Sequence, residues 1–307
     1  PAPTRARSSQ SHFGSSPLLD ILSVAHPFHG KTWLSSSAAA TPPPFRPTRR
    51  MSRKYLLIGN WKCNGSLSSS GSLAKDIAEG LGKMDTKNVE VFVAPTMMHL
   101  LPVLKQTEGS KLGVCSQNVS SQPCGAFTGE VSATQLKDAG ISWTIIGHSE
   151  RRQSDKIQSF ESNKIVASKV KLALQEGLSV CVCIGETDAE RKEGKTFAVL
   201  EEQIKAIKDS VSDWSRFSLA YEPLWAIGTG NTATSGQAQE VHAHIRSFME
   251  KTVSAEVAKN LRICYGGSVK PKNSKELIGQ GDIDGFLVGG ASLKPDSYLA
   301  IIESMIS

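Results

Sequence analysis

The 307-residue chain lacks the features that would direct it to a membrane or to nucleic acid. No uninterrupted apolar run approaches the roughly 20 residues that a membrane-spanning helix needs. The net charge is +6, but residues 1–50 hold six cationic residues against the single acid Asp20, so the rest of the chain carries only +1. A body this close to neutrality attracts phosphate backbones weakly, and we expect neither a membrane nor nucleic acid among its partners.

Several catalytic and cofactor-binding motifs are missing as well. The chain has no Gly-x-Ser-x-Gly sequence, which many acyl-transfer enzymes use to present a nucleophilic serine. It has no cluster of Asp and His with the spacing of a metal site. The first apolar run continues into Gly59-Asn60-Trp61-Lys62 and not into the G-x-G-x-x-G turn of a dinucleotide-binding fold. Acyl transfer, metal-assisted hydrolysis and dinucleotide binding are therefore disfavoured.

The cysteines do not have the spacing of zinc ligands either. Six are present: Cys63, Cys115, Cys124, Cys181, Cys183 and Cys264. Cys181 and Cys183 are separated by one residue in an apolar run, whereas zinc ligands are usually separated by two to four residues. We expect buried structural thiols in a reducing compartment, although any one of them can still be reactive.

Residues 1–50 differ in composition from the rest of the chain. They are rich in Ser, Pro, Ala and Arg, and 35–44 is a low-complexity run of Ser, Ala, Thr and Pro. Such a composition buries too little apolar surface to offset chain entropy, so we expect a disordered leader over 1–50 and a folded domain over 51–307. The leader suits an organelle transit peptide. Two alternatives stay open, a disordered tail and upstream sequence translated ahead of a true start at Met51.

From Lys54 onward, short apolar runs alternate with helix-like stretches. The runs are bounded by Gly, Asn or Pro, which predicts buried strands at 55–59, 89–94, 112–115, 143–146, 179–184, 217–221, 261–265 and 286–288. Helices are expected at 72–81, 132–139, 162–176, 196–210, 237–252, 273–278 and 295–305. The stretch 97–105 is ambiguous because Pro102 interrupts it.

This alternation predicts parallel strands joined by helical crossovers. Residues 51–307 are close in number to the roughly 250 that are typical of an eight-fold α/β barrel. We therefore predict a single-domain (β/α)₈ TIM barrel preceded by a disordered segment. An open doubly wound sheet is the alternative, because the same alternation of elements builds both folds.

Active sites of such barrels form at the carboxyl ends of the strands, so the residues that follow each predicted strand are the candidates. They are Asn60 and Lys62 after the first strand, His148, Ser149 and Glu150 after the fourth, Glu222 after the sixth, Gly266, Gly267 and Ser268 after the seventh, and Gly289 and Gly290 after the eighth. Taken singly, each has an ordinary explanation, such as a salt-bridged Glu, a hydrogen-bonded His, a solvated Lys or a tight glycine turn.

Together, these groups suit one kind of chemistry. A carboxylate base, a hydrogen-bond donor and a cation on one rim can abstract a proton next to a carbonyl and stabilise the resulting enediolate. Glycine turns with accessible backbone N–H groups after the last two strands suit a phosphate group on the substrate.

Five stretches also carry a resemblance to a known family. They are 59–64 (GNWKCN), 146–152 (IGHSERR), 220–230 (AYEPLWAIGTG), 264–269 (CYGGSV) and 287–293 (LVGGASL). These stretches resemble triosephosphate isomerases and occur in the order of that family. The resemblance covers 54–307 and leaves residues 1–50 outside.

The resemblance implies roles for the candidate residues. Glu222 would shuttle a proton between adjacent carbons of dihydroxyacetone phosphate and glyceraldehyde 3-phosphate, and His148 would donate to the carbonyl oxygen as a neutral imidazole. Lys62 would place a positive charge beside the phosphate and the enediolate, and Asn60 would help to hold the substrate. Ser149 and Glu150 would support the site. No cofactor is implied, because the base returns the proton that it removes.

A lid over the site is implied as well. Residues 223–231 resemble the lid of this family, with Gly228 bringing a backbone N–H to the phosphate on closure. Ser268, Gly289 and Gly290 would complete the phosphate site. Closure excludes water, which would otherwise allow the enediolate to lose its phosphate. Asn231 stands where the family usually has Lys, a departure that can alter the rate of lid motion.

The resemblance further implies a homodimer, because residues 117–130 resemble an interdigitating loop whose Thr128 would reach the active site of the partner. Without the resemblance, this stretch is simply a long surface loop. The expected compartment is the cytosol or the plastid stroma, the latter if 1–50 is a cleaved transit peptide. Two other functions stay in view: a catalytically idle barrel that serves as a binding protein, and another phosphate-binding barrel that acts on indole or sugar precursors.

Overall fold

The computed structural model describes residues 53–152, 158–227 and 233–307. All of them belong to Pro47–Ser307, the second of two units into which the chain divides. The predicted boundary between leader and folded domain at residue 50, and the lid residues Gly228 and Asn231, lie outside the described residues.

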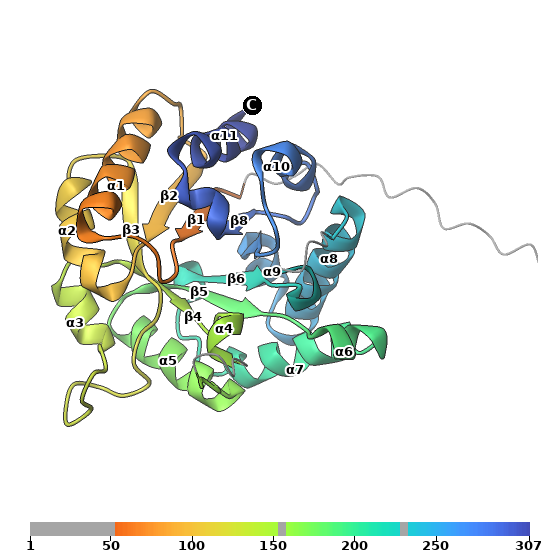
Figure 1. Cartoon of the computed structure of the whole chain (residues 1–307). Coiled ribbons are helices and arrows are strands. Elements are labelled where there is room, and N and C mark those ends of the chain that lie inside the picture. The colour runs from red at the N-terminus through yellow and green to blue at the C-terminus, as the bar shows by residue number, and fades with distance from the viewer. Residues whose placement is uncertain (1–52, 153–157, 228–232) are drawn as a thin grey trace, which may run out of the picture. The chain divides into compact units, whose positions relative to one another are not determined.

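The described residues form eight parallel strands that close into a barrel with helices around the outside (Figure 1). The strands are β1 (Tyr55–Asn60), β2 (Val89–Ala94), β3 (Leu112–Ser116), β4 (Trp143–Ile146), β5 (Ser179–Ile184), β6 (Phe217–Tyr221), β7 (Arg262–Tyr265) and β8 (Gly285–Val288). Each strand pairs with the next in the sequence, and β8 pairs with β1. The predicted (β/α)₈ barrel is confirmed, and the open sheet is excluded.

The seam between the first and last strands depends on a glycine. Gly285 lies opposite Leu56 and has a φ of +144°. A Cβ atom on Gly285 would lie 1.8 Å from the carbonyl oxygen of Leu56. Because no other residue avoids both the backbone strain and this clash, glycine permits β8 to approach β1 closely enough to close the ring.

The strands are apolar on both faces because both faces are buried. Side chains such as Ile58, Cys115, Cys181 and Cys264 fill the interior of the barrel, whereas neighbours such as Leu57 pack against the surrounding helices. A strand buried on both faces appears in the sequence as a continuous apolar run, which explains why the predicted strand limits agree with the structure to within one residue.

The helices are α1 (Leu67–Gly82), α2 (Leu100–Gln106), α3 (Ala133–Asp138), α4 (Ser149–Arg152), α5 (Asn163–Gln175), α6 (Asp188–Lys192), α7 (Thr196–Lys208), α8 (Ser235–Thr252), α9 (Ala255–Asn260), α10 (Pro271–Ile278) and α11 (Pro295–Ile306). The predicted start of the first helix at residue 72 was wrong. Ser66 and Ser69 form a reciprocal capping box, so the serine-rich stretch begins the helix five residues earlier.

The ambiguous stretch around Pro102 is helical. It forms a 3₁₀ turn at Met97–His99, followed by α2. Pro102 lies in the first turn of α2, where its missing N–H would have no intrahelical partner, so it does not break the helix.

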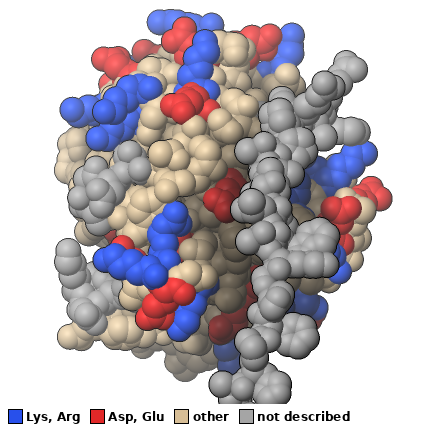
Figure 2. All heavy atoms as spheres, turned by 90° about the vertical axis from the view of Figure 1, so that its right-hand side faces the viewer, with Lys and Arg blue, Asp and Glu red and all other residues tan. Residues whose placement is uncertain are grey.

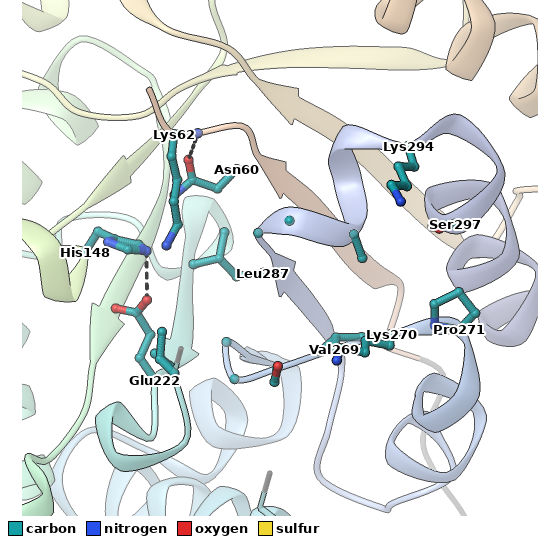
Figure 3. A pocket seen from close by; sticks show the side chains of 17 residues that line it. Asn60, Lys62, His148, Glu222, Val269, Lys270, Pro271, Leu287, Lys294 and Ser297 are labelled. Carbon is teal, nitrogen blue, oxygen red and sulfur yellow. Dashed lines mark hydrogen bonds and ion pairs between the residues drawn. The ribbon is translucent and has the colours of Figure 1, made fainter. Parts of the chain in front are cut away.

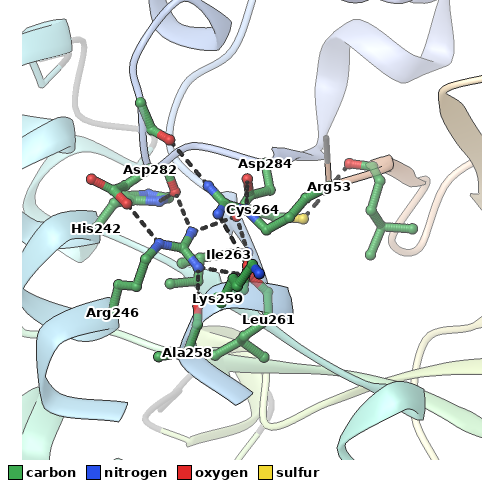
Figure 4. Close-up of polar contacts among 12 residues, drawn as sticks. Arg53, His242, Arg246, Ala258, Lys259, Leu261, Ile263, Cys264, Asp282 and Asp284 are labelled. Atoms are coloured by element: carbon green, nitrogen blue, oxygen red, sulfur yellow. Dashed lines mark hydrogen bonds and ion pairs between the residues drawn. The ribbon is translucent and has the colours of Figure 1, made fainter. Parts of the chain in front are cut away.

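At the amino ends of the strands, two arginines share one buried carboxylate (Figure 4). Asp284 accepts hydrogen bonds from Nε of Arg53 at 2.7 Å and from Nη2 of Arg246 at 2.6 Å. Its Oδ2 also accepts the backbone N–H of Ile263 at 3.1 Å, and Arg246 binds Asp282 at 2.6 Å. The network links Arg53, which lies two residues before β1, with helix α8 and strand β7, and these parts are far apart in the sequence.

The surface shows charges of both signs. On the face drawn in Figure 2, Lys and Arg side chains alternate with Asp and Glu and do not gather into one basic patch. This mixture agrees with the near-neutral charge of the folded part of the chain. Among the helices that the structure describes, none is long and apolar enough to cross a bilayer.

Candidate active site

Glu222 lies at the carboxyl end of β6, where the barrel places its functional groups. Its side chain is 2% exposed. The backbone N–H of Ser149 donates to Oε2 at 2.9 Å, and Oε1 lies 3.0 Å from Nε2 of His148. A Cβ atom on Gly266 would lie 2.9 Å from Cγ of Glu222, so the glycine after β7 provides the space in which this side chain sits.

The environment of His148 favours one arrangement of its protons. The backbone N–H of Glu150 donates to Nδ1 of His148 at 3.2 Å. Nδ1 therefore acts as the acceptor, which leaves the proton of a neutral imidazole on Nε2, the nitrogen that faces Glu222 and the cavity.

The two buried groups shift each other's pKa. Burial lowers the pKa of His148, but the Glu222 carboxylate outweighs burial, so the pKa is raised above its usual value. Burial raises the pKa of Glu222, but His148, the Ser149 N–H and Lys62 together outweigh it, so the pKa is lowered. Glu222 is consequently ionised at neutral pH, which is the protonation state that a general base needs.

Lys62 has a strained backbone that two neighbours hold in place. Its φ is +51°, in the left-handed region that residues other than glycine rarely adopt. The Asn60 side chain accepts the Lys62 N–H at 3.0 Å, and the Gln117 side chain donates to the Lys62 carbonyl at 2.8 Å. No sequence pattern points to this role of Gln117, because a polar residue in a long loop has many ordinary explanations.

The Lys62 ammonium lies at the rim of the site. It forms an ion pair with Oε1 of Glu150 at 2.8 Å. Its Cε is 3.6 Å from the place that a Cβ atom on Gly289 would occupy, so the side chain passes beside the glycine turn after β8. A positive charge thus adjoins both the His148–Glu222 pair and this turn.

One cavity of about 500 Å³ brings these groups together (Figure 3). It is lined by nine of the candidate residues: Asn60, Lys62, His148, Glu222, Gly266, Gly267, Ser268, Gly289 and Gly290. Ser149 and Glu150 do not line this cavity. Ser149 contacts Glu222 through its backbone N–H, and Glu150 contacts Lys62 through its carboxylate. The residues predicted from five different strand ends therefore surround a common space.

The first part of the predicted lid lies beside this cavity. It forms a 3₁₀ turn at Leu224–Ala226, and Ile227 lines the cavity. Glu186, which is fully buried, accepts hydrogen bonds from Trp225 Nε1 and from Tyr221 Oη, both at 3.0 Å. The sequence did not indicate Glu186, although it connects the end of β6 to the 3₁₀ turn through these two hydrogen bonds. The predicted phosphate contact of Gly228 lies outside the described residues.

Thr128 lies in a long loop that projects from the barrel between β3 and α3 (Figure 1). A hydrogen bond from the Ser120 N–H to the Val131 carbonyl, 2.8 Å long, closes the base of the loop. Thr128 is exposed and does not line the cavity of its own chain.

Comparison with known proteins identifies the family. The family model described as Triosephosphate isomerase matches residues 55–305. A triosephosphate isomerase of Coprinopsis cinerea is 49% identical over 257 residues, which cover 83% of this chain and 99% of the relative. The triosephosphate isomerase of Emericella nidulans is 48% identical over 258 residues, covering 83% and 100%. A cytosolic triosephosphate isomerase of Oryza sativa subsp. japonica is 48% identical over 254 residues, covering 83% and 98%.

The family match and the barrel cover the same residues, and the motifs that line the cavity are those that carried the resemblance in the sequence. The chain belongs to the triosephosphate isomerase family, whose members are isomerases.

Proposed function

We propose that the protein interconverts dihydroxyacetone phosphate and D-glyceraldehyde 3-phosphate, the reaction of glycolysis and gluconeogenesis, and of the Calvin cycle if the protein resides in a plastid. The observation that carries the proposal is the pairing of an ionised, buried Glu222 with His148 in a cavity that glycine turns also line. This arrangement supports proton transfer next to a carbonyl in a substrate that carries a phosphate.

In this mechanism, Glu222 removes a proton from the carbon next to the carbonyl. The Nε2–H of His148 donates to the carbonyl oxygen, which becomes the enediolate oxygen. Glu222 raises the pKa of His148 only while the two side chains are in contact, and this contact is lost when the carboxylate turns to the substrate carbon. The imidazole then acts in its neutral form, because Nδ1 already accepts the N–H of Glu150 and protonation of Nδ1 would break that bond. Glu222 then returns the proton to the neighbouring carbon, so the reaction needs no net oxidant or reductant.

Lys62 stabilises the charge that develops in this reaction. Its ammonium adjoins both the reacting end of the cavity and the turn at Gly289. In a partly buried site, a fixed cation stabilises an enediolate more effectively than water does, because it does not have to reorient. Asn60 holds the strained backbone of Lys62, which keeps the ammonium in position.

The phosphate of the substrate is proposed to bind at Ser268, Gly289 and Gly290, with Gly228 from the lid. Small residues expose backbone N–H groups, which bind phosphate oxygens well. Closure of residues 223–231 would then exclude water from the enediolate.

A coupled assay for glyceraldehyde 3-phosphate formed from dihydroxyacetone phosphate tests the function. We expect activity in the wild-type protein and a near-complete loss in Glu222→Gln, which preserves size but removes the base. Wild-type protein without activity would instead assign the chain to the alternative of a binding or scaffold barrel.

We also propose a homodimer. Leu67, Met98, Leu101 and Phe127 are large apolar side chains, each more than 40% exposed, and exposed apolar groups of this kind mark protein interfaces. A second cavity of about 400 Å³, lined by Lys62 and by residues of the loop that carries Thr128, would receive the same loop of a partner. Light scattering coupled to size exclusion should give the mass of two chains, and Met98→Asp should shift it toward one. A monomeric wild-type protein would contradict the proposal.

The protein is proposed to reside in the cytosol, or in the plastid stroma if residues 1–50 are a cleaved transit peptide. The rice relative is described as cytosolic, and the leader is basic and rich in serine. Sequencing of the native amino terminus, together with cell fractionation, tests both options. A start near Met51 in a plastid fraction would support cleavage, whereas an intact leader in the cytosol would exclude it.

A further inference from the structure

The active-site cavity continues beyond the residues that the proposed reaction uses. Lys270, Pro271, Lys294 and Ser297 line it as well. In Figure 3 these four residues lie across the cavity from His148 and Glu222, past the glycine turns. A volume of about 500 Å³ lies in the range of sites for drug-sized ligands, ~300–1,000 Å³, and is more than a three-carbon phosphate fills. We call the part lined by these four residues the outer lobe.

Two lysines occupy equivalent positions in the outer lobe. Lys270 and Lys294 are each followed by a proline that begins a helix, α10 after β7 and α11 after β8. The Lys270 N–H donates to the Asn273 side chain at 2.8 Å, and the Lys294 carbonyl accepts the Tyr298 N–H at 3.0 Å. The fold therefore holds the backbones of Lys270 and Lys294 in place at the same end of the cavity.

The outer lobe is cationic. Within the described part of the chain, neither Lys270 nor Lys294 forms an ion pair with a carboxylate. Glu222 is the one acidic residue among the described residues that line the cavity, and it is buried against His148 at the far end. Asp296 follows Lys294 closely in the sequence but is exposed and does not line the cavity.

We propose that the outer lobe is a second anion subsite. It binds the second phosphoryl group of small diphosphate anions whose first phosphoryl group occupies the glycine turns. Lys270 and Lys294 supply the positive charge, and the Ser297 hydroxyl supplies a hydrogen-bond donor. Such anions would therefore be competitive inhibitors that bind more tightly than a single phosphate does. This inference rests on the proposed function, because it takes the glycine turns to be the phosphate site.

The chain offers a matched control for the two lysines. Lys272 lies on α10 two residues beyond Lys270, and Lys259 lies at the end of α9. Both are exposed, and neither lines the active-site cavity. The double variant Lys259→Gln/Lys272→Gln removes the same charge as Lys270→Gln/Lys294→Gln but leaves the outer lobe intact.

The test compares the competitive inhibition constants of inorganic phosphate and inorganic pyrophosphate against the isomerisation, at constant ionic strength and without divalent metal. Wild-type protein should bind pyrophosphate about tenfold more tightly than phosphate. Lys270→Gln/Lys294→Gln should weaken pyrophosphate by about tenfold and leave phosphate within about twofold, since each exposed lysine contributes modestly to anion binding. The control variant should behave as wild type. Thermal unfolding of each variant verifies that it is folded.

Three results would overturn the subsite. If both double variants weaken pyrophosphate binding equally, the loss of affinity comes from the change in net charge and not from the outer lobe. If Lys270→Gln/Lys294→Gln weakens the binding of phosphate and pyrophosphate equally, the two lysines attract anions in general and form no second subsite. Non-competitive inhibition by pyrophosphate would place its site elsewhere. If wild-type protein does not isomerise triose phosphates, the proposed function fails, and titration calorimetry of the same variants with pyrophosphate still decides whether the subsite exists.

Discussion

Oε1 of Glu222 lies 3.0 Å from Nε2 of His148, so the proposed base and the proposed electrophile are hydrogen-bond partners of each other. A substrate that uses both groups has to replace this contact with its own carbon-bound proton and carbonyl oxygen. The Ser149 N–H donates to the second carboxylate oxygen at 2.9 Å, so the side chain of Glu222 is held at both oxygens before a substrate binds.

The first prediction concerns the reach of the base. Glu222→Asp withdraws the carboxylate by one methylene group, and a displacement of about 1 Å at a reacting atom can cost on the order of a hundredfold in rate. We expect kcat to fall by roughly 10²- to 10³-fold with little change in KM, measured in the coupled assay. The exposed Glu303→Asp serves as the control. An unchanged kcat would remove Glu222 from the role of base.

The second prediction concerns the fixed charge at the rim. Lys62→Met keeps an unbranched side chain that reaches as far as Cε and removes the ammonium. We expect kcat/KM to fall by about 10³-fold or more, because the enediolate and the phosphate both lose their cation. Lys259→Met removes a charge outside the cavity and should have almost no effect. Full activity of Lys62→Met would refute its electrostatic role.

The third prediction concerns acid stability. His242 is fully buried, its Nδ1 lies 3.3 Å from the Asp282 carbonyl, and burial lowers its pKa to about 4. An unfolded histidine titrates near 6.5, so between pH 6.5 and 4 the unfolded chain takes up a proton that the folded chain does not. Above pH 6.5, His242 therefore makes its full contribution to the free energy of unfolding. As the pH drops toward 4, this contribution decreases by about 3 kcal/mol.

Urea unfolding of wild type and of His242→Phe at several pH values between 4 and 7 measures this contribution. Phe retains a ring near Tyr221 and Tyr265 but cannot titrate. We expect the variant to lose about 3 kcal/mol less than wild type over this range. Parallel curves for the two proteins would show that His242 does not account for the loss.

The fourth prediction concerns thiol reactivity. Cys115, Cys181, Cys183 and Cys264 are buried, and burial raises their pKa, that of Cys181 to about 12. Thiolate is the reactive form, so these four groups should resist alkylation until the protein unfolds. Cys63 and Cys124 are the exposed thiols. Mass spectrometry after alkylation of folded Cys63→Ser/Cys124→Ser should find no label, and label on the other four would contradict the buried assignment.

The fifth prediction concerns the carboxylate that two arginines share. Asp284→Asn leaves Arg53 and Arg246 with a neutral partner in a buried position, and breaking a buried ion pair typically costs about 3–5 kcal/mol. The same change at the exposed Asp209 should cost less than about 1 kcal/mol. Equal urea midpoints for the two variants would show that the network contributes little to stability.

The fold was predictable largely because the strands are buried on both faces. The limits of β2, β4, β5 and β6 follow directly from short runs of mostly apolar residues. The short helices α6 and α9 were not predicted, because five or six residues are too few to show a helical period.

The candidate site was predictable for a different reason. Parallel strands direct their carboxyl ends to one edge, so residues such as His148 and Glu222 could be grouped without a structure. Gln117, Glu186, Lys270 and Lys294 could not be found in this way. Their roles depend on which backbone groups and cavity walls they face, and such contacts leave no pattern in a single sequence.

The seam between β8 and β1 has a consequence for biosynthesis. Strand β1 is among the first parts of the barrel to leave the ribosome. Its edge that pairs with β8 has no partner until Gly285–Val288 has been translated. An emerging chain therefore carries an unsatisfied sheet edge, a surface prone to wrong pairing, through nearly the whole of its synthesis. Premature termination anywhere before β8 would yield an open sheet and no ring, and the turn at Gly289 and Gly290 would be lost with it.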